Sequence, residues 1–153
     1  MLVFPLFLLA LTVSCTKKEA QSPAKTSQPE EIVRRFVFLS SEAKEPKDKM
    51  ALKEFCTGPM EAAFEQMSDE QFRLFYLSGN IKIEDMKTLS SNVEKDSATV
   101  HYQVVVENKQ GTDVTKETNE REAILKELPG GWRIEFIRAR GADQLKFAKG
   151  MIF

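Results

Sequence analysis

The second half of the chain contains two segments in which apolar and polar residues alternate with a period of two. In residues 98–106 the apolar side chains fall at every second position, at Val100, Tyr102, Val104 and Val106. The same spacing returns at Trp132, Ile134 and Phe136. A period of two is typical of a β-strand with one face in a core. Both segments are therefore predicted to be strands, with these apolar residues on the buried face.

The turn before the last strand gives the strongest fold signal in the chain. Pro129-Gly130-Gly131 directly precedes Trp132 and has the residue types of a β-hairpin turn. We expect residues 121–128 to be the partner strand of this hairpin. The polar residues 114–120 are then an edge strand or its continuation, and residues 108–112 are the turn that leads into it.

The first half of the chain has helical spacing. Ser27-Gln28-Pro29-Glu30 has the Ser-x-x-Glu spacing of a capping box, with Pro29 in the first turn. Apolar residues then recur at helical spacing, at Ile32, Val33, Phe36 and Val37. Pro46 is expected to end this helix, and Asp48 to cap a second short helix over residues 50–56.

Further helices and then strands follow. Gly58-Pro59 marks a boundary before a helical pattern at residues 60–67, and Ser68 and Gln71 form a second capping box that opens a helix closed by Gly79. Residues 81–93 turn to strand alternation across a bend, with a polar turn at 92–97. Helices followed by a meander predict an α+β domain, in which a curved antiparallel sheet wraps around the N-terminal helices.

The N-terminal residues look like a targeting segment. Residues 1–14 are uncharged and mostly apolar, and are too short to span a bilayer as a stable helix. Leu11-Thr12-Val13-Ser14-Cys15 resembles the lipobox of bacterial lipoprotein signal peptides. The resemblance implies that residues 1–14 are a signal peptide and that Cys15 becomes a lipid-modified, palmitate-bearing N-terminus. The alternative is an apolar N-terminal helix that only anchors or packs.

Length and composition fit one domain on a tether. Residues 15–28 lack large apolar side chains and form the lipidated cysteine and a flexible tether, which leaves residues 29–153 for a single domain. The formal net charge of −1 disfavours a nucleic-acid partner. With Cys15 used for lipidation, Cys56 is expected to be a small buried hydrophobe. Residues 142–153 are expected to fold back onto the domain, with a partner contact as the alternative.

The order of elements resembles a known fold family. A long amphipathic helix, shorter helices and a curved meander that ends in Gly131-Trp132-Arg133-Ile134 are similar to the nuclear-transport-factor-2-like (NTF2-like) cone. Residues 122–136, together with the leader, resemble small bacterial lipoproteins of that superfamily. In the superfamily the sheet and helices enclose a pocket that binds a ligand, catalyses a reaction or is filled by side chains. The resemblance also leaves a homodimer open.

The candidate catalytic residues are few. An acid–base enzyme of this fold needs an ionisable group in the cone, often with a tyrosine beside it. His101, Tyr76 and Tyr102 are the weak candidates, and His101 alternates onto the face opposite Tyr102. If that face lines the cone, His101 is a base, and if it faces solvent, His101 is a surface residue.

The apolar residues of the helical half offer a second kind of site. A hydrophobic ligand pocket would use Phe36, Phe64, Phe72 and Trp132, although residues of this type at helical spacing more often form packed core. The lone histidine and the absence of Cys or carboxylate clusters at ligand spacing predict no metal site and no cofactor.

These observations lead to an expectation about function. The chain is expected to be a lipid-anchored membrane protein of the bacterial cell envelope, facing the periplasm or the cell surface. Its domain would be non-enzymatic and would bind a protein partner or a small apolar ligand. The alternatives are a small isomerase- or dehydratase-like enzyme that uses the cone pocket, and a structural assembly factor of the envelope.

Overall fold

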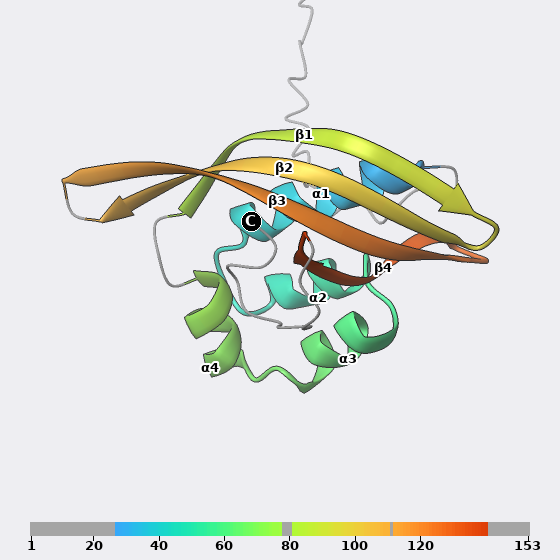
Figure 1. Cartoon of the computed structure of the whole chain (residues 1–153). Coiled ribbons are helices and arrows are strands. Elements are labelled where there is room, and N and C mark those ends of the chain that lie inside the picture. The colour runs from blue at the N-terminus through green and yellow to red at the C-terminus, as the bar shows by residue number, and fades with distance from the viewer. Residues whose placement is uncertain (1–26, 78–80, 111, 141–153) are drawn as a thin grey trace, which may run out of the picture.

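The computed structural model describes residues 27–77, 81–110 and 112–140. The helical elements are α1 (Pro29–Glu42), α2 (Asp48–Lys53), α3 (Gly58–Gln66), α4 (Asp69–Phe72) and the π-helical turn η1 (Arg73–Leu77). The strands are β1 (Ile81–Glu94), β2 (Ser97–Gln110), β3 (Asp113–Leu128) and β4 (Gly131–Ala139). Figure 1 shows the helices gathered on one side of the long, curved strands. The predicted α+β class, with helices first and a curved antiparallel sheet after them, is confirmed.

The sheet is an antiparallel meander in the order β1-β2-β3-β4. β2 pairs with β3 along its whole length, from Ser97 opposite Lys126 to Gln110 opposite Asp113. β4 is shorter and ends with Ala139 opposite Arg121. The polar residues 114–120 are therefore the continuation of the strand at 121–128, and β4 does not pair with them.

The alternation of β2 places its apolar residues as predicted. Val100, Tyr102 and Val104 are fully buried and Val106 is nearly so, whereas the residues between them are partly exposed. The buried face is the concave face, which packs on the helices, because α1 contacts both β1 and β2. The polar face of β2, which carries His101, is the outer face of the sheet.

The prediction that Phe136 shares the buried face of β4 is wrong. Trp132 and Ile134 are buried as expected, but Phe136 is only partly buried and Ile137 takes the next core position. Ile134 lies opposite Leu125 and Phe136 lies opposite Ile124, so Glu135 is an extra residue in the pairing. A β-bulge of this kind reverses which side chains face the core beyond it.

The first two turns of the meander are tighter than predicted. β1 continues to Glu94, so only Lys95 and Asp96 separate it from β2, and Lys95 has a positive φ of 54°. The bend expected within β1 corresponds to two shifts of register, between Ile83 and Asp85 and between Thr88 and Ser90. β2 likewise extends to Gln110 and takes up most of the turn predicted at 108–112.

The helix boundaries agree with the sequence in part. Pro29 opens α1, and α3 begins at Gly58, which has a φ of +55°. α2 is shorter than predicted because it ends at Lys53. Asp48 does not cap it; its carboxylate accepts the backbone N–H groups of Lys44 and Glu45 in the loop before the helix. The predicted features at Cys15, Gly79 and 142–153 lie outside the described residues.

Of the two predicted capping boxes, one forms. The Ser68 side chain accepts the Gln71 backbone N–H, and the Gln71 side chain accepts the Ser68 backbone N–H. At α1 the N-cap residue is Gln28 rather than Ser27, and no side chain caps the helix. The box predicted at Ser27 is therefore wrong, because the helix begins one residue too late for that spacing to close.

The two serines give a matched pair for measuring the cap. We expect Ser68→Ala to lower the free energy of unfolding by about 1 kcal/mol, the usual cost of losing an N-cap. Ser27→Ala should change the free energy of unfolding by no more than about 0.5 kcal/mol, as expected of a substitution that removes no helix cap. Urea unfolding followed by circular dichroism measures both, and equal effects of the two substitutions would contradict the assignment.

Candidate functional site

The structure separates the candidate catalytic residues. Tyr102 is fully buried on the concave face of β2, and Tyr76 is buried against Phe72, with the two rings stacked at 4.8 Å. Burial raises the pKa of both phenols, so both stay protonated at neutral pH. His101 lies on the outer face of β2. The structure therefore does not place His101 and a tyrosine side by side inside the cone.

The four residues predicted to line a ligand pocket belong to the hydrophobic core cluster of the described residues. Phe36, Phe64, Phe72 and Trp132 are all buried. The Phe36 and Phe64 rings meet edge to face at 6.2 Å, and the Phe64 ring lies 5.5 Å from the Tyr76 ring. Ring pairs at these distances are in favourable contact and leave no room for a ligand between them.

The outer face carries a polar row that crosses all the strands of the sheet. Ser90 of β1 lies opposite His101 of β2, His101 opposite Glu122 of β3, and Glu122 opposite Arg138 of β4. Their side chains are connected, with 3.3 Å between Ser90 Oγ and His101 Nδ1 and 2.6 Å between His101 Nε2 and Glu122 Oε2. Arg138 Nε donates to Glu122 Oε1 at 2.6 Å. We call these four residues the outer row.

Glu122 is the most buried member of the outer row, with a side chain only 12% exposed. Burial alone disfavours its charged form, but hydrogen bonds from Arg138 and His101 and their charges favour it more. The pKa of Glu122 is lowered as a result. The carboxylate is thus ionised and shared between two donors on neighbouring strands.

In the outer row a serine, a histidine and a carboxylate are hydrogen-bonded in sequence, and the backbone around the histidine and the carboxylate is engaged in the sheet. A nucleophilic serine needs backbone or side-chain donors that stabilise an oxyanion. β2 and β3 are inner strands, so their backbone N–H groups around His101 and Glu122 donate to neighbouring strands. The simplest role of the outer row is to connect the strands and fix their register.

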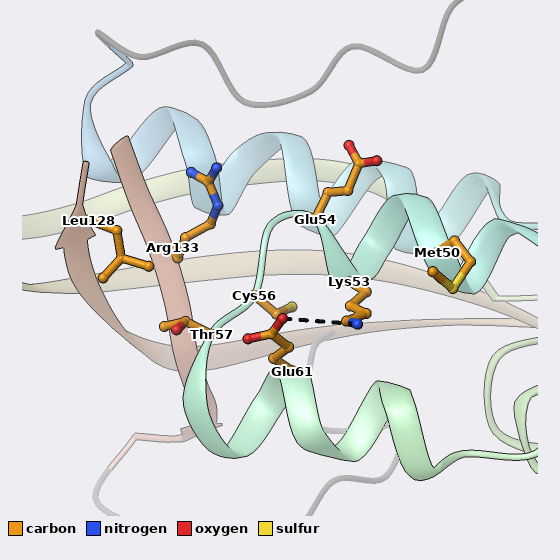
Figure 2. Close-up of a pocket in the computed structure, with 8 residues that line it drawn as sticks. All are labelled: Met50, Lys53, Glu54, Cys56, Thr57, Glu61, Leu128 and Arg133. Carbon is orange, nitrogen blue, oxygen red and sulfur yellow. Dashed lines mark ion pairs between the residues drawn. The ribbon is translucent and has the colours of Figure 1, made fainter. Parts of the chain in front are cut away.

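A surface groove lies where the helices meet the last hairpin (Figure 2). Its volume is about 440 Å³. The lining residues come from α2, the segment after it, α3 and the two strands of the hairpin: Met50, Lys53, Glu54, Cys56, Thr57, Glu61, Leu128 and Arg133. We call it the α2–α3–hairpin groove.

Backbone pairing builds one wall of this groove. Thr57 N–H donates to Ile134 O at 2.9 Å, and Ile134 N–H donates to Phe55 O at 2.8 Å. The segment after α2 therefore runs beside β4 as a short parallel bridge between Cys56 and Ile134. This pairing holds α2 and α3 against the hairpin and fixes the width of the groove.

The groove contains the thiol of Cys56 and the ammonium group of Lys53. Cys56 is buried, as predicted, and burial raises the pKa of its thiol, so it remains protonated and a poor nucleophile. Lys53 pairs with Glu65 and, at 4.0 Å, with Glu61. Within residues 27–77, 81–110 and 112–140, no group of three or more His, Cys, Asp or Glu side chains could hold a metal ion.

Neither the outer row nor the groove was found from the sequence. The outer row depends on which residues of four strands lie opposite one another, and alternation gives the face of a strand but not its register. The groove joins residues 50–61 to Leu128 and Arg133, which are far apart in the chain. For the groove, the sequence signal was the Pro129-Gly130-Gly131 turn, which places Leu128 and Arg133 on the same hairpin.

Comparison with solved structures identifies the architecture. The chain is similar to a crystal structure of an NTF2-like protein with a cystatin-like fold from Novosphingobium aromaticivorans, with a TM-score of 0.50 and 15% identity over 80% of this chain and 85% of that one. The fold is an NTF2-like cone. No protein-family model matches the sequence, and no curated protein matches it either.

Two further structures are similar to this NTF2-like cone. One is the intermembrane space region of the chloroplast protein ARC6, with a TM-score of 0.54 and 15% identity over 72% of this chain and 92% of that one. The other is RPA3114, a SEC-C motif containing protein from Rhodopseudomonas palustris, with a TM-score of 0.52 and 14% identity over 72% and 77%. Similarity at this level of identity concerns the fold alone.

Proposed function

We propose that this chain is a non-enzymatic, lipid-anchored protein of the bacterial cell envelope whose NTF2-like cone binds a protein partner at its surface. The observation that supports a surface site is the contact between aromatic rings in the described part of the interior. Phe36, Phe64 and Phe72 occupy the part of the cone in which a small ligand would lie. When the interior of a domain is packed with side chains, a partner is recognised at the outer surface.

The other functions expected from the sequence have less support. A small apolar ligand inside the cone would have to displace aromatic rings that are in contact. An isomerase- or dehydratase-like enzyme would need His101 and a tyrosine in one cavity, and these face opposite sides of the sheet. A role in envelope assembly is compatible with surface binding. It differs from the proposed function only in the identity of the protein partner.

The anchor is the part of the proposal that rests on sequence, namely on the lipobox-like residues that end at Cys15. A lipoprotein N-terminus carries several acyl chains, and each buried methylene contributes about 0.8 kcal/mol of membrane affinity. None of the helices in residues 27–77 is long and apolar enough to cross a membrane.

Metabolic labelling with an alkyne analogue of palmitate tests the anchor, and the second cysteine provides the control. We expect the wild-type chain and Cys56→Ala to take up the label and Cys15→Ala to lose it, because the lipid is attached at Cys15 alone. Label that persists in Cys15→Ala, or a wild-type chain that is never labelled, would contradict the anchor.

Native mass spectrometry of the full-length chain, extracted gently in detergent from the cells that make it, tests the filled interior. The expected result is the mass of the lipidated chain without a small molecule bound. A reproducible added mass would point to an internal ligand site and overturn surface binding as the function.

A further inference from the structure

The α2–α3–hairpin groove combines exposed apolar side chains with a fixed positive charge. Met50 of α2 is 58% exposed and Leu128, at the end of β3, is 41% exposed. A partner that covers these side chains would remove apolar surface from water, which favours binding. Met50 is also flexible and polarisable, which suits it to contact with varied side chains. The two residues mark opposite sides of the groove in Figure 2.

Arg133 supplies the positive charge, and its own hairpin holds it in place. Its Nη1 donates to Trp132 O at 2.9 Å and to Gly130 O at 3.3 Å. Its Nη2 lies over Gly130, where an added Cβ would come within 3.3 Å of it. These contacts reduce the conformational entropy that the side chain loses when a ligand binds. The guanidinium group is thus pre-organised at the rim of the groove.

The charge of Arg133 is the one that a ligand would complement. Across the described parts of the chain, Arg133 makes no ion pair with a carboxylate, and both hydrogen bonds given above go to backbone oxygens. Lys53, in contrast, is already paired with Glu61 and Glu65. A guanidinium group has five N–H donors in a planar fork that matches a carboxylate.

The middle of the groove decides between a peptide and a fatty acid. An acyl chain needs a continuous apolar lining, but Thr57 and the Lys53–Glu61 ion pair interrupt the apolar surface. A peptide carries its own N–H and C=O groups, which can satisfy polar groups of this kind as it binds.

We propose that the α2–α3–hairpin groove binds an acidic, apolar peptide segment of a protein partner. A carboxylate of the peptide pairs with Arg133, and apolar side chains of the peptide cover Leu128 and Met50. The inference rests on the proposed function, because it names the site and the chemistry of the partner for surface binding.

A displayed library of random linear peptides, selected on the immobilised full-length chain in detergent, tests this directly. We expect the enriched peptides to combine Asp or Glu with Leu, Ile or Phe. Synthetic copies are then measured by fluorescence anisotropy. Arg133→Gln should weaken binding about tenfold or more, the size expected for one charged hydrogen-bonded contact. Circular dichroism verifies that the variant is folded.

Arg140→Gln is the matched control, since it removes the same charge from the far end of β4, where Arg140 pairs with Glu120. It should change the peptide affinity by less than about twofold, as expected of a distant rim charge. Leu128→Ser should weaken binding, and Arg133→Glu should regain affinity for a peptide in which Lys replaces the acidic residue.

The inference would be overturned if the enriched peptides had no acidic residue, or if wild type and Arg133→Gln bound the peptide with equal affinity. Displacement of the bound peptide by laurate would also overturn it, because the groove would then be a fatty-acid site. A failure here is distinguishable from a failure of the proposed function. If the palmitate label is found at Cys15 and the interior is empty of ligand while no peptide is enriched, the groove assignment alone is wrong.

Discussion

Replacement of Phe36 by alanine is expected to lower the free energy of unfolding by about 3–5 kcal/mol, the usual cost of emptying a buried phenylalanine site. Phe36 is 0% exposed, and its ring lies 6.3 Å from the Phe55 ring and 6.2 Å from the Phe64 ring. Its removal forfeits these contacts and leaves a cavity that the sheet and helices can close only in part. A loss of this size is a large fraction of the stability of an ordinary domain. Urea unfolding of the full-length chain in detergent gives the difference.

The same variant tests whether the cone is filled. A dry apolar cavity of the size of a phenyl ring binds benzene, so benzene should raise the melting temperature of Phe36→Ala and leave that of the wild type unchanged. Met50→Ala is the control, because Met50 is 58% exposed and its loss should cost no more than about 0.5 kcal/mol. A wild-type chain that is stabilised by benzene would show that the interior is open.

Replacement of Glu122 by glutamine is expected to have the second largest effect, a loss of about 1–3 kcal/mol at neutral pH. The glutamine keeps the shape of the side chain but removes the charge that Arg138 and His101 share. Glu120→Gln is the matched control on the same strand. Its ion pair with Arg140 is exposed and should be worth between about 0 and 1 kcal/mol. Equal losses in the two variants would contradict the role of the outer row.

The pH dependence gives the sign of the Glu122 contribution. The pKa of Glu122 is lowered on folding from its ordinary value of 4.5, so between these values the unfolded chain binds more protons than the folded one. Stability from this group is fully present above pH 4.5 and is lost as the pH falls through the lowered value. We expect the stability difference between wild type and Glu122→Gln to shrink as the pH falls below about 4.5. A difference that grows on acidification would show the opposite shift.

Particular residues show how far the sequence could predict this fold. The alternation of Val100, Tyr102 and Val104 placed them correctly in the core, and the capping box at Ser68 formed as expected, because both patterns depend on contacts within a few residues. The same reasoning failed at Phe136 and at Ser27. A bulge beside Glu135 and the start of α1 at Pro29 are set by packing against other elements, which local spacing does not report.

The candidate sites show the same limit. The sequence picked out His101 as a residue on the polar face of a strand, but its partners Ser90, Glu122 and Arg138 became visible only when the register of the strands was known. The aromatic residues of the helices were weighed from the sequence as pocket or core, and the ring contacts of Phe36 and Phe64 favour core.

The sequence by itself therefore determined the class of the domain, the order of its elements and the turn at Pro129-Gly130, because periodicity and turn chemistry are properties of neighbouring residues. Only the tertiary structure decided that the Phe36 and Phe64 rings are in contact, that the outer row joins the four described strands, and that Arg133 lies beside α2 and α3. Each of these depends on contacts between segments distant in the chain. Such contacts arise when the sheet twists over the helices to bury their shared apolar surface.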